Sequence, residues 1–236
     1  MELTNDVLEW LKQLVAIPRT SRNETDAADF LFALMQELGL EPQRHKNNIW
    51  CVRPGYDAAR PTLLLNAHID TVKPNPAWTR DPFTPTLEGD VLYGLGTNDD
   101  GASLVTLLQT FRTLPPQSYN IVFLASAEEE VGGKDGVSAV LPLLPLITVG
   151  LVGEPTGMQP AIAEKGLMVI DVTEEGRAGH AARDEGDNAI YHAVDDIMAV
   201  RNMHFDRVSP LLGAVKATVT VINAGSQHNV IPAECT

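Results

Sequence analysis

The chain has 236 residues, of which 44% are hydrophobic and 20% charged, a composition typical of a globular protein with one large domain or two smaller ones. Acidic residues outnumber basic residues by 31 to 17, and the formal net charge is −14. No basic run or patch is visible in the sequence, which argues against a nucleic-acid partner. The acidic charge is explained by solubility, with attraction of a cationic substrate as the alternative.

The chain carries no targeting or membrane-spanning pattern. The first ten residues, MELTNDVLEW, have neither the basic nor the apolar region of a signal peptide, and no apolar run approaches the length of a membrane span. Cys51 and Cys235 lie far apart in the sequence and form no metal-binding pair. We therefore expect a cytoplasmic protein with no membrane partner.

Helical and strand patterns alternate over the first 164 residues, which predicts an α/β fold with a mostly parallel sheet and flanking helices. In the second expected helix, Ser21 and Glu24 have the spacing of a capping box, and Gly39 suits the helix end. Helices are expected over residues 3–18, 21–40 and from about residue 102, and apolar strands over residues 47–53, 61–72, 120–130 and 147–155, the last of them buried.

The pattern changes after Glu164. Residues 165–176 and 215–225 alternate between polar and apolar, as strands with one solvated face do, and residues 187–203 are helical in pattern. We expect a first domain over residues 1–164 and a smaller α+β domain over residues 165–236. The last residues, NVIPAECT, stop where another strand begins, so we expect the chain to be the amino-terminal part of a longer protein.

Charged side chains follow the end of each apolar strand. In open α/β sheets, ligands bind beyond the carboxyl ends of the strands, so these side chains are expected at one edge. One histidine with several carboxylates suits zinc, or cobalt or manganese, and two metal ions would relieve the mutual repulsion of the carboxylates. The residues concerned are His68 and Asp70, then Asp99 and Asp100 before a helix, then Glu128, Glu129 and Glu130, and finally Glu154.

Each motif has a plainer interpretation when it is taken alone. The His68-x-Asp70 pair fits a structural histidine, the glutamate triplet fits a solvated surface run, and the segments around Asp99 and Glu154 fit turns. Their shared position relative to the strands favours the metal site. The segment GLGTND resembles a dinucleotide-binding fingerprint, but it lacks the third glycine and does not directly follow an apolar strand, so this alternative is rejected.

The motifs NAHIDTVKP, YGLGTNDDGAS, SAEEEVGG, VGEPT, GRAGHAA and NVIP occur together and in this order. In this ordered set the chain resembles the acetylornithine deacetylase and succinyl-diaminopimelate desuccinylase family of co-catalytic zinc hydrolases. The resemblance covers essentially the whole chain and is nearest to the acetylornithine deacetylases. It implies that residues 1–164 form a catalytic metal-binding domain and that residues 165–236 begin a lid and dimerisation domain.

The resemblance also implies a role for each residue at the sheet edge. His68 and Glu154 would bind the first metal ion, Asp99 would bridge both ions, and Glu130 would bind the second. Asp70 would orient the imidazole of His68. Glu129 would be the general base, and the peptide bond after Asp99 would be cis.

Two further roles fall in the second domain. The resemblance implies that His180 reaches the active site of the other subunit of a homodimer and stabilises the oxyanion, and that Asn229 contacts the substrate. A solvent-exposed loop histidine is the alternative for His180.

Two departures from the family pattern are present. Gly101 and Ala102 stand where many members have Lys-Gly, which leaves the subfamily open. The family's final metal ligand is a histidine near the carboxyl terminus, and we expect it beyond Thr236.

The function that follows from the resemblance is hydrolysis of a small N-acyl amino acid by two zinc ions. The first choice of substrate is N-acetyl-L-ornithine or N-succinyl-L-ornithine, in arginine biosynthesis. The enzyme alternatives are a di-zinc dipeptidase or carboxypeptidase and a succinyl-diaminopimelate desuccinylase. The non-enzyme alternative is a metal-binding or dimerisation relative without activity, against which the presence of Glu129 argues.

Overall fold

The computed structural model describes residues 5–236 and divides the chain into two compact units, unit 1 (residues 1–158) and unit 2 (residues 159–236). Unit 1 is built on a five-stranded sheet with the order β1-β2-β6-β3-β7. β3 runs parallel to β6 and β7, whereas β2 runs antiparallel to β1 and β6. The α/β class is confirmed, with a mixed sheet. The strands are β1 (Gln43–His45), β2 (Asn48–Val52), β3 (Thr62–His68), β6 (Asn120–Ser126) and β7 (Val149–Val152).

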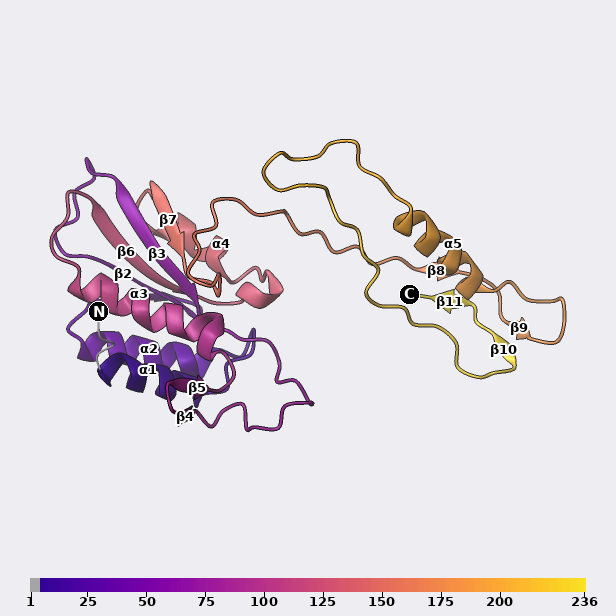
Figure 1. The fold of residues 1–236 in the computed structure, drawn as a ribbon, viewed down its shortest axis with the longest axis horizontal. Helices are drawn as coiled ribbons and strands as arrows, with labels where there is room; N and C mark the ends of the chain where they lie inside the picture. Colours follow the sequence, from indigo (N-terminus) through magenta and orange to yellow (C-terminus); the bar gives the residue numbers. More distant parts are fainter. Residues whose placement is uncertain (1–4) are drawn as a thin grey trace. The chain divides into compact units, whose positions relative to one another are not determined.

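Three helices cover one face of this sheet and a short helix lies on the other (Figure 1). Because both faces are covered, β3 and β6 are buried along nearly their whole length and are mostly apolar rather than alternating. Successive residues enter opposite cores: Ile121, Phe123 and Ala125 of β6 pack with the three-helix side, and Val122 and Leu124 with the other. The helices are α1 (Asn5–Val15), α2 (Thr25–Glu37) and α3 (Ala102–Thr113) on the first face and α4 (Val137–Val140) on the second.

The start of α2 differs from the expected capping box. The helix begins at Thr25, and its N-cap residue, Glu24, makes no capping hydrogen bond with its side chain. The Ser21 hydroxyl donates to Asp70 Oδ2 at 2.6 Å, and Glu24 accepts from the backbone N–H groups of Arg22 and Glu128. The capping-box prediction is therefore wrong, because both side chains are engaged in other contacts. The predicted end is confirmed: Gly39, just past the helix, has φ +76°.

β7 differs from the expected buried strand. It pairs with β3 alone and forms the edge of the sheet. Val149, Leu151 and Val152 are 58%, 47% and 59% exposed, so the prediction of burial is wrong within residues 5–236. The apolar pattern predicts the strand, but burial also requires a covering layer on each face.

An unpredicted hairpin, β4 (Thr86–Glu88) and β5 (Val91–Tyr93), follows the Pro-rich segment of unit 1. Three short helical turns complete the unit, namely Thr97–Gly101, Glu129–Val131 and Leu141–Leu143.

Unit 2 contains one helix, α5 (Ala189–Arg201), within residues 187–203, where the sequence predicts a helix. Its N-cap is Asn188, whose side-chain oxygen accepts the N–H of Ile190 at 3.0 Å. Its short strands form two antiparallel pairs, β9 with β10 and β8 with β11. Ala189 and Ala193 of α5 pack on Cys235 of β11 in a small core. The strands are β8 (Glu174–Glu175), β9 (Gly179–His180), β10 (Val230–Ile231) and β11 (Glu234–Cys235).

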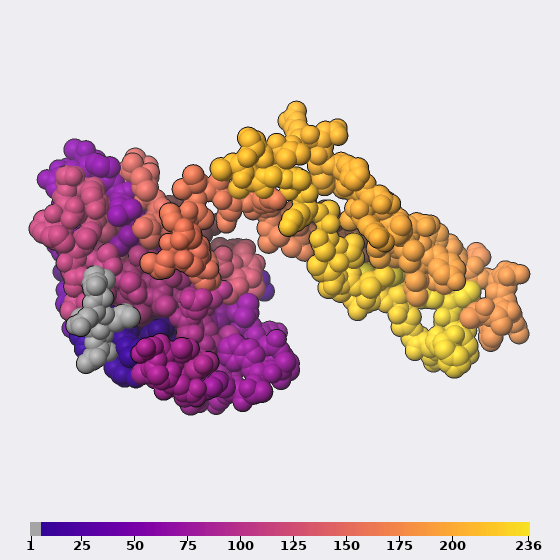
Figure 2. Space-filling model, viewed as in Figure 1, coloured from indigo at the N-terminus to yellow at the C-terminus, as the bar shows by residue number. Residues whose placement is uncertain are grey.

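The long strands expected in unit 2 are wrong in extent. Of residues 165–176 only Glu174–Glu175 pairs, and of residues 215–225 only Ala224 forms a bridge, with Cys235. Most of the remaining residues have no neighbouring strand, and Leu167 and Val221 are 92% and 68% exposed. Figure 2 shows the gold-coloured residues just after α5 at the surface as well. Alternation predicts which side chains share a face, but a strand forms only where a partner accepts its hydrogen bonds.

Of the helices within residues 5–236, none combines the length and the apolar character that crossing a membrane requires.

The central packing of unit 1 gives the first prediction. Phe123 is fully buried and its ring centroid lies 6.1 Å from that of Phe111. Phe123→Ala should lower the free energy of unfolding by about 3–5 kcal/mol, because it leaves a cavity in the core. Val152→Ala, on the exposed edge strand, should change it by no more than about 0.5 kcal/mol. Denaturant unfolding of both variants measures this, and equal losses would contradict the described packing.

Candidate metal centre

His68 is the last residue of β3 and its imidazole is buried, with 3% of the residue exposed. Nε2 lies 2.9 Å from Asp99 Oδ1. Nδ1 lies 2.9 Å from the backbone oxygen of Asp70 and 3.6 Å from its Oδ1. The backbone of Asp70 therefore makes the closer contact with the ring, and the contact leaves Nε2 directed at Asp99.

Asp99 lies in the turn Thr97–Gly101 that precedes α3, and its backbone is not helical. The Asp99–Asp100 peptide bond is cis, as the resemblance implies. The turn is tied to the rest of unit 1 by buried Arg19, which donates to the carbonyl oxygens of Gly96 and Ile69 at 2.9 and 2.7 Å. Gly96 has φ +72°, and a Cβ there would lie 2.5 Å from the Arg19 guanidinium, so only glycine fits.

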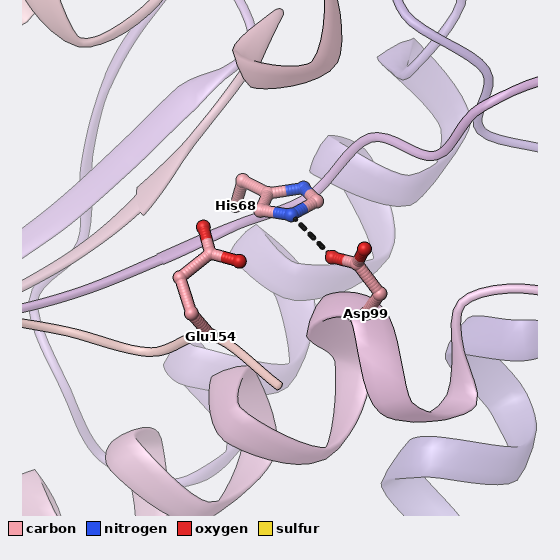
Figure 3. A group of neighbouring side chains, drawn as sticks. All are labelled: His68, Asp99 and Glu154. Carbon is pink, nitrogen blue, oxygen red and sulfur yellow. Dashed lines mark hydrogen bonds and ion pairs between the residues drawn. The ribbon is translucent and has the colours of Figure 1, made fainter. Parts of the chain in front are cut away.

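Glu154 follows β7 by two residues. Gly153 continues the pairing with β3 by donating its N–H to Asn66 O at 2.7 Å. A Cβ on Gly153 would lie 2.4 Å from Ser103 Cβ, so the chain passes close to α3 here. This places the Glu154 carboxylate beside His68 and Asp99, as Figure 3 shows.

His68, Asp99 and Glu154 each direct one ligand atom into a common group, in which all three atoms lie within 4.8 Å of one another. Ligand atoms held about 2.0–2.2 Å from one zinc ion are themselves about 3 Å apart or more, so the His68–Asp99 separation of 2.9 Å suits two ligands of one ion. An imidazole with two carboxylates is a donor set that divalent metal ions take.

The glutamate triplet forms the turn after β6. The Asp70 carboxylate accepts the backbone N–H groups of Glu129 and Glu130 at 3.0 and 3.2 Å. Glu128 has φ +54°, and the Glu129 side chain is exposed while that of Glu130 is half-buried. The orientation of the turn is thus fixed through its backbone, which leaves the carboxylates of Glu129 and Glu130 free of these contacts.

The electrostatics of the cluster also fit a cation. Burial alone would lower the pKa of His68, but hydrogen bonding and charge from Asp70, with smaller contributions from Asp100 and Asp99, raise it to about 10. Burial raises the pKa of Glu154 to about 7, and nearby Asp100, Glu129 and Asp99 add to the rise. Burial and the Asp99 charge likewise raise the pKa of Glu130. Carboxylates that are held together in this way are stabilised in their charged form by a positive ion.

Asp100 is among the charged residues that the sequence places at this edge, but the family resemblance implies no role for it. It is fully buried, its Oδ2 accepts the backbone N–H of His68 at 3.3 Å, and its Oδ1 has no hydrogen-bond partner among residues 5–236. Burial raises its pKa to about 6, although contacts with Ser103 and His68 oppose this. The adjacent pair Asp99-Asp100 points to both residues, but nothing in the sequence shows which carboxylate faces His68 Nε2 and which is buried.

His180 and Asn229 belong to unit 2 and lie together there. β9 pairs with β10 so that His180 is opposite Val230, and Ala181 donates its N–H to Asn229 O at 3.0 Å. Both side chains are exposed, and His180 Nδ1 accepts the N–H of Ala182 at 3.1 Å. The pairing joins two residues that are far apart in the sequence, independently of the cluster in unit 1.

Residues 64–232 match the sequence profile of Peptidase family M20/M25/M40, which covers well over half of the chain. The chain belongs to this family. It is 26% identical to a succinyl-diaminopimelate desuccinylase of Delftia acidovorans over 254 residues, which cover 97% of this chain and 66% of the relative. It is 36% identical to an acetylornithine deacetylase of Pectobacterium carotovorum over 149 residues, 59% of this chain and 38% of the relative.

The chain therefore spans about two thirds or less of the length of these relatives. Among solved structures, a Staphylococcus aureus tripeptidase has a TM-score of 0.66 at 22% identity, with 97% of this chain and 63% of that one covered. A Bacillus subtilis protein described as a dinuclear metal binding peptidase from the M20 family has a TM-score of 0.60 at 17% identity, with 98% and 61% covered. Both likenesses show the fold that the M20 family membership implies.

The cluster generates the second prediction. Glu154→Ala removes a metal ligand and should therefore weaken the binding of a divalent cation by more than about 100-fold. Loss of a residue that only supports a ligand costs up to about 100-fold, and loss of the ligand itself should cost more. Titration calorimetry with Zn²⁺, Co²⁺ and Mn²⁺ on the metal-free protein measures the change. Glu37→Ala, an exposed residue at the end of α2, is the matched control and should bind as the unaltered protein does. Equal affinities in the two variants would rule out Glu154 as a ligand.

Proposed function

We propose that the full-length protein hydrolyses the amide bond of an N-acylated amino acid with the help of bound metal ions. The observation that carries this proposal is the convergence of His68, Asp99 and Glu154 at the carboxyl edge of the sheet, next to the turn of Glu129 and Glu130. Membership of the M20 family supports it, as do relatives that are named as a desuccinylase and a deacetylase.

The metal ions in this proposal are two zinc ions, with cobalt or manganese as alternatives. His68 and Glu154 would hold the first ion, Asp99 would be shared between both, and Glu130 would hold the second. The neighbour described as a dinuclear metal binding peptidase supports the number two. When bound, such ions lower the pKa of water to about 7 and polarise the carbonyl group that is attacked.

The chain's own residues supply the proton transfers. Glu129 is exposed beside the cluster and its carboxylate accepts no hydrogen bond from residues 5–236, so it is free to take a proton from the attacking water. It then returns this proton to the departing amine nitrogen, and the products are a carboxylate and a free amino acid. Asp70 keeps Glu129 in place through the backbone rather than by touching the substrate.

Unit 2 would complete the site in a homodimer. We place the imidazole of His180 from the second copy on the developing oxyanion, where a hydrogen-bond donor stabilises the transition state. Asn229 would contact the substrate. The β9–β10 pairing supports the two acting together, since it holds their backbones side by side.

N-acetyl-L-ornithine is the first choice of substrate, with N-succinyl-L-ornithine next, which would place the protein in cytoplasmic arginine biosynthesis. The 36% identity to an acetylornithine deacetylase supports this choice. N-succinyl-diaminopimelate is the second candidate, and the match to a desuccinylase over 97% of the chain favours it.

A substrate panel tests the proposal. Zinc-loaded full-length protein should release a free amino acid from N-acetyl-L-ornithine with a higher kcat/KM than from N-succinyl-L-ornithine, N-succinyl-diaminopimelate or a dipeptide. An amine-detecting assay gives the four values. A preference for N-succinyl-diaminopimelate or the dipeptide would replace the substrate and keep the amide chemistry. No hydrolysis of any member would favour a non-catalytic relative.

The two neighbouring glutamates are expected to fail in different ways. Glu129→Gln should keep both metal equivalents and lower kcat by about 100- to 10,000-fold, because it removes the general base. Glu130→Ala should lose one metal equivalent. Metal analysis and steady-state kinetics on the full-length protein separate the two outcomes. Near-normal turnover in Glu129→Gln, or unchanged metal content in Glu130→Ala, would reverse the assignment within the triplet.

A further inference from the structure

The turn that carries Glu129 and Glu130 is held by buried side chains from three other parts of unit 1. Four consecutive backbone N–H groups each donate to a side-chain oxygen, and none of the accepting residues is close in sequence. The hydrogen bonds are Ala127 to Asn48 Oδ1 at 3.0 Å, Glu128 to Glu24 Oε1 at 3.1 Å, Glu129 to Asp70 Oδ1 at 3.0 Å and Glu130 to Asp70 Oδ2 at 3.2 Å.

Glu24 is the least expected member of this set. It is fully buried, and no Lys, Arg or His of residues 5–236 forms an ion pair with it. Its Oε1 accepts the N–H groups of Arg22 at 2.8 Å and of Glu128, and its Oε2 accepts Asn47 Nδ2 at 3.3 Å. A buried carboxyl group is costly unless it is well hydrogen-bonded, and the Glu24 side chain makes no capping hydrogen bond with α2. Its contact with the turn therefore needs a reason.

That reason lies in the direction of the Glu128 peptide. Glu128 has φ +54°, a conformation that L residues rarely adopt, and Gly133 donates its N–H to Glu128 O at 2.9 Å to close the turn. Glu24 receives the N–H on the other side of the same residue. The N–H and the carbonyl oxygen of Glu128 are thus both hydrogen-bonded, which fixes the direction of the backbone at this residue. That direction determines where the next residue, Glu129, lies.

We propose that Glu24 is a positioning residue for Glu129. It fixes the Ala127–Glu128 peptide, one residue ahead of the base, so that the Glu129 carboxylate stands beside the metal cluster, although Glu24 touches neither substrate nor metal. The inference rests on the proposed function. General bases act only within hydrogen-bond reach of the proton, and a displacement of about 1 Å can cost about 100-fold in rate.

Three variants of the full-length protein test this. Glu24→Ala removes the acceptor and should lower kcat by about 100-fold with KM and metal content unchanged. Glu24→Gln keeps an oxygen for the two N–H groups, and its new amide can pair with the Asn47 oxygen if Asn47 turns away from Arg44, whose Nη2 donates to that oxygen at 3.1 Å. This variant should restore kcat to within about 3-fold of normal, far above the level expected for Glu24→Ala. Asn47→Ala is the matched control, because it removes the hydrogen bond to Oε2 and none to the turn.

A second readout needs neither substrate nor metal. Hydrogen exchange followed by mass spectrometry on the metal-free protein should show faster exchange of the N–H groups in residues 127–130 in Glu24→Ala. Exchange in residues 121–125 of the buried strand β6 should stay as in the unaltered protein, and Asn47→Ala should leave both segments unchanged.

The outcomes are decisive. In Glu24→Ala, faster hydrogen exchange confined to residues 127–130, together with a loss of kcat that Glu24→Gln recovers, supports the positioning role. Unchanged exchange there, equal acceleration in β6, normal kcat in the folded Glu24→Ala protein, or a Glu24→Gln protein as slow as Glu24→Ala overturns it. If Glu24→Ala does not fold, Glu24→Asp withdraws the carboxylate by one methylene, and a normal kcat in that variant also overturns the proposal.

Failure of the proposed function is recognised separately. It would appear as an inactive unaltered protein or an active Glu129→Gln protein, and the exchange measurement would still report whether Glu24 holds the turn.

Discussion

The buried carboxylate of Asp70 connects the parts of unit 1 on which the cluster depends. It accepts the Ser21 hydroxyl at 2.6 Å and the N–H groups of Glu129 and Glu130, while its backbone oxygen faces His68 Nδ1 at 2.9 Å. Burial alone would raise the pKa of Asp70, but the nearby His68 ring and hydrogen bonds from the Ser21 hydroxyl and the Glu129 N–H lower it below its ordinary value. An ionised Asp70 therefore joins the loop before α2, the end of β3 and the turn after β6.

This connection works because of the strand register. β3 and β6 are parallel and His68 is paired with Ser126, so both chains leave the sheet at the same level. Two residues further on, the segment after β3 reaches Asp70 and the segment after β6 reaches Glu128. The Asp70 carboxylate is then within hydrogen-bond distance of the N–H groups of Glu129 and Glu130. β7 runs parallel on the other side of β3 and delivers Glu154 to the same edge. The position of the cluster thus follows from three parallel strands.

This part of the arrangement could be predicted from the sequence, because apolar runs that end in charged residues mark the carboxyl ends of parallel strands. The roles of Ser21 and Glu24 could not. Their spacing matches a capping box, yet their partners lie 49 and 104 residues away, and a local pattern contains no information on such contacts. The same limit explains β7 and the extended segments of unit 2, whose apolar patterns predicted burial and pairing that depend on layers elsewhere.

The carboxylates at this edge divide by what their oxygens already do. Asp70 and Glu24 are fully buried, and both oxygens of each accept hydrogen bonds from the protein. Glu154 and Glu130 accept none from residues 5–236, and Asp99 is paired only with His68. Three hydrogen bonds occupy most of the acceptor sites of each satisfied carboxylate. Burial, with neighbouring negative charges, raises the pKa of Glu154 and Glu130, so these unsatisfied carboxylates gain most from a cation. Hydrogen-bond satisfaction, which no residue pattern reveals, therefore separates the carboxylates that build the site from those available to bind in it.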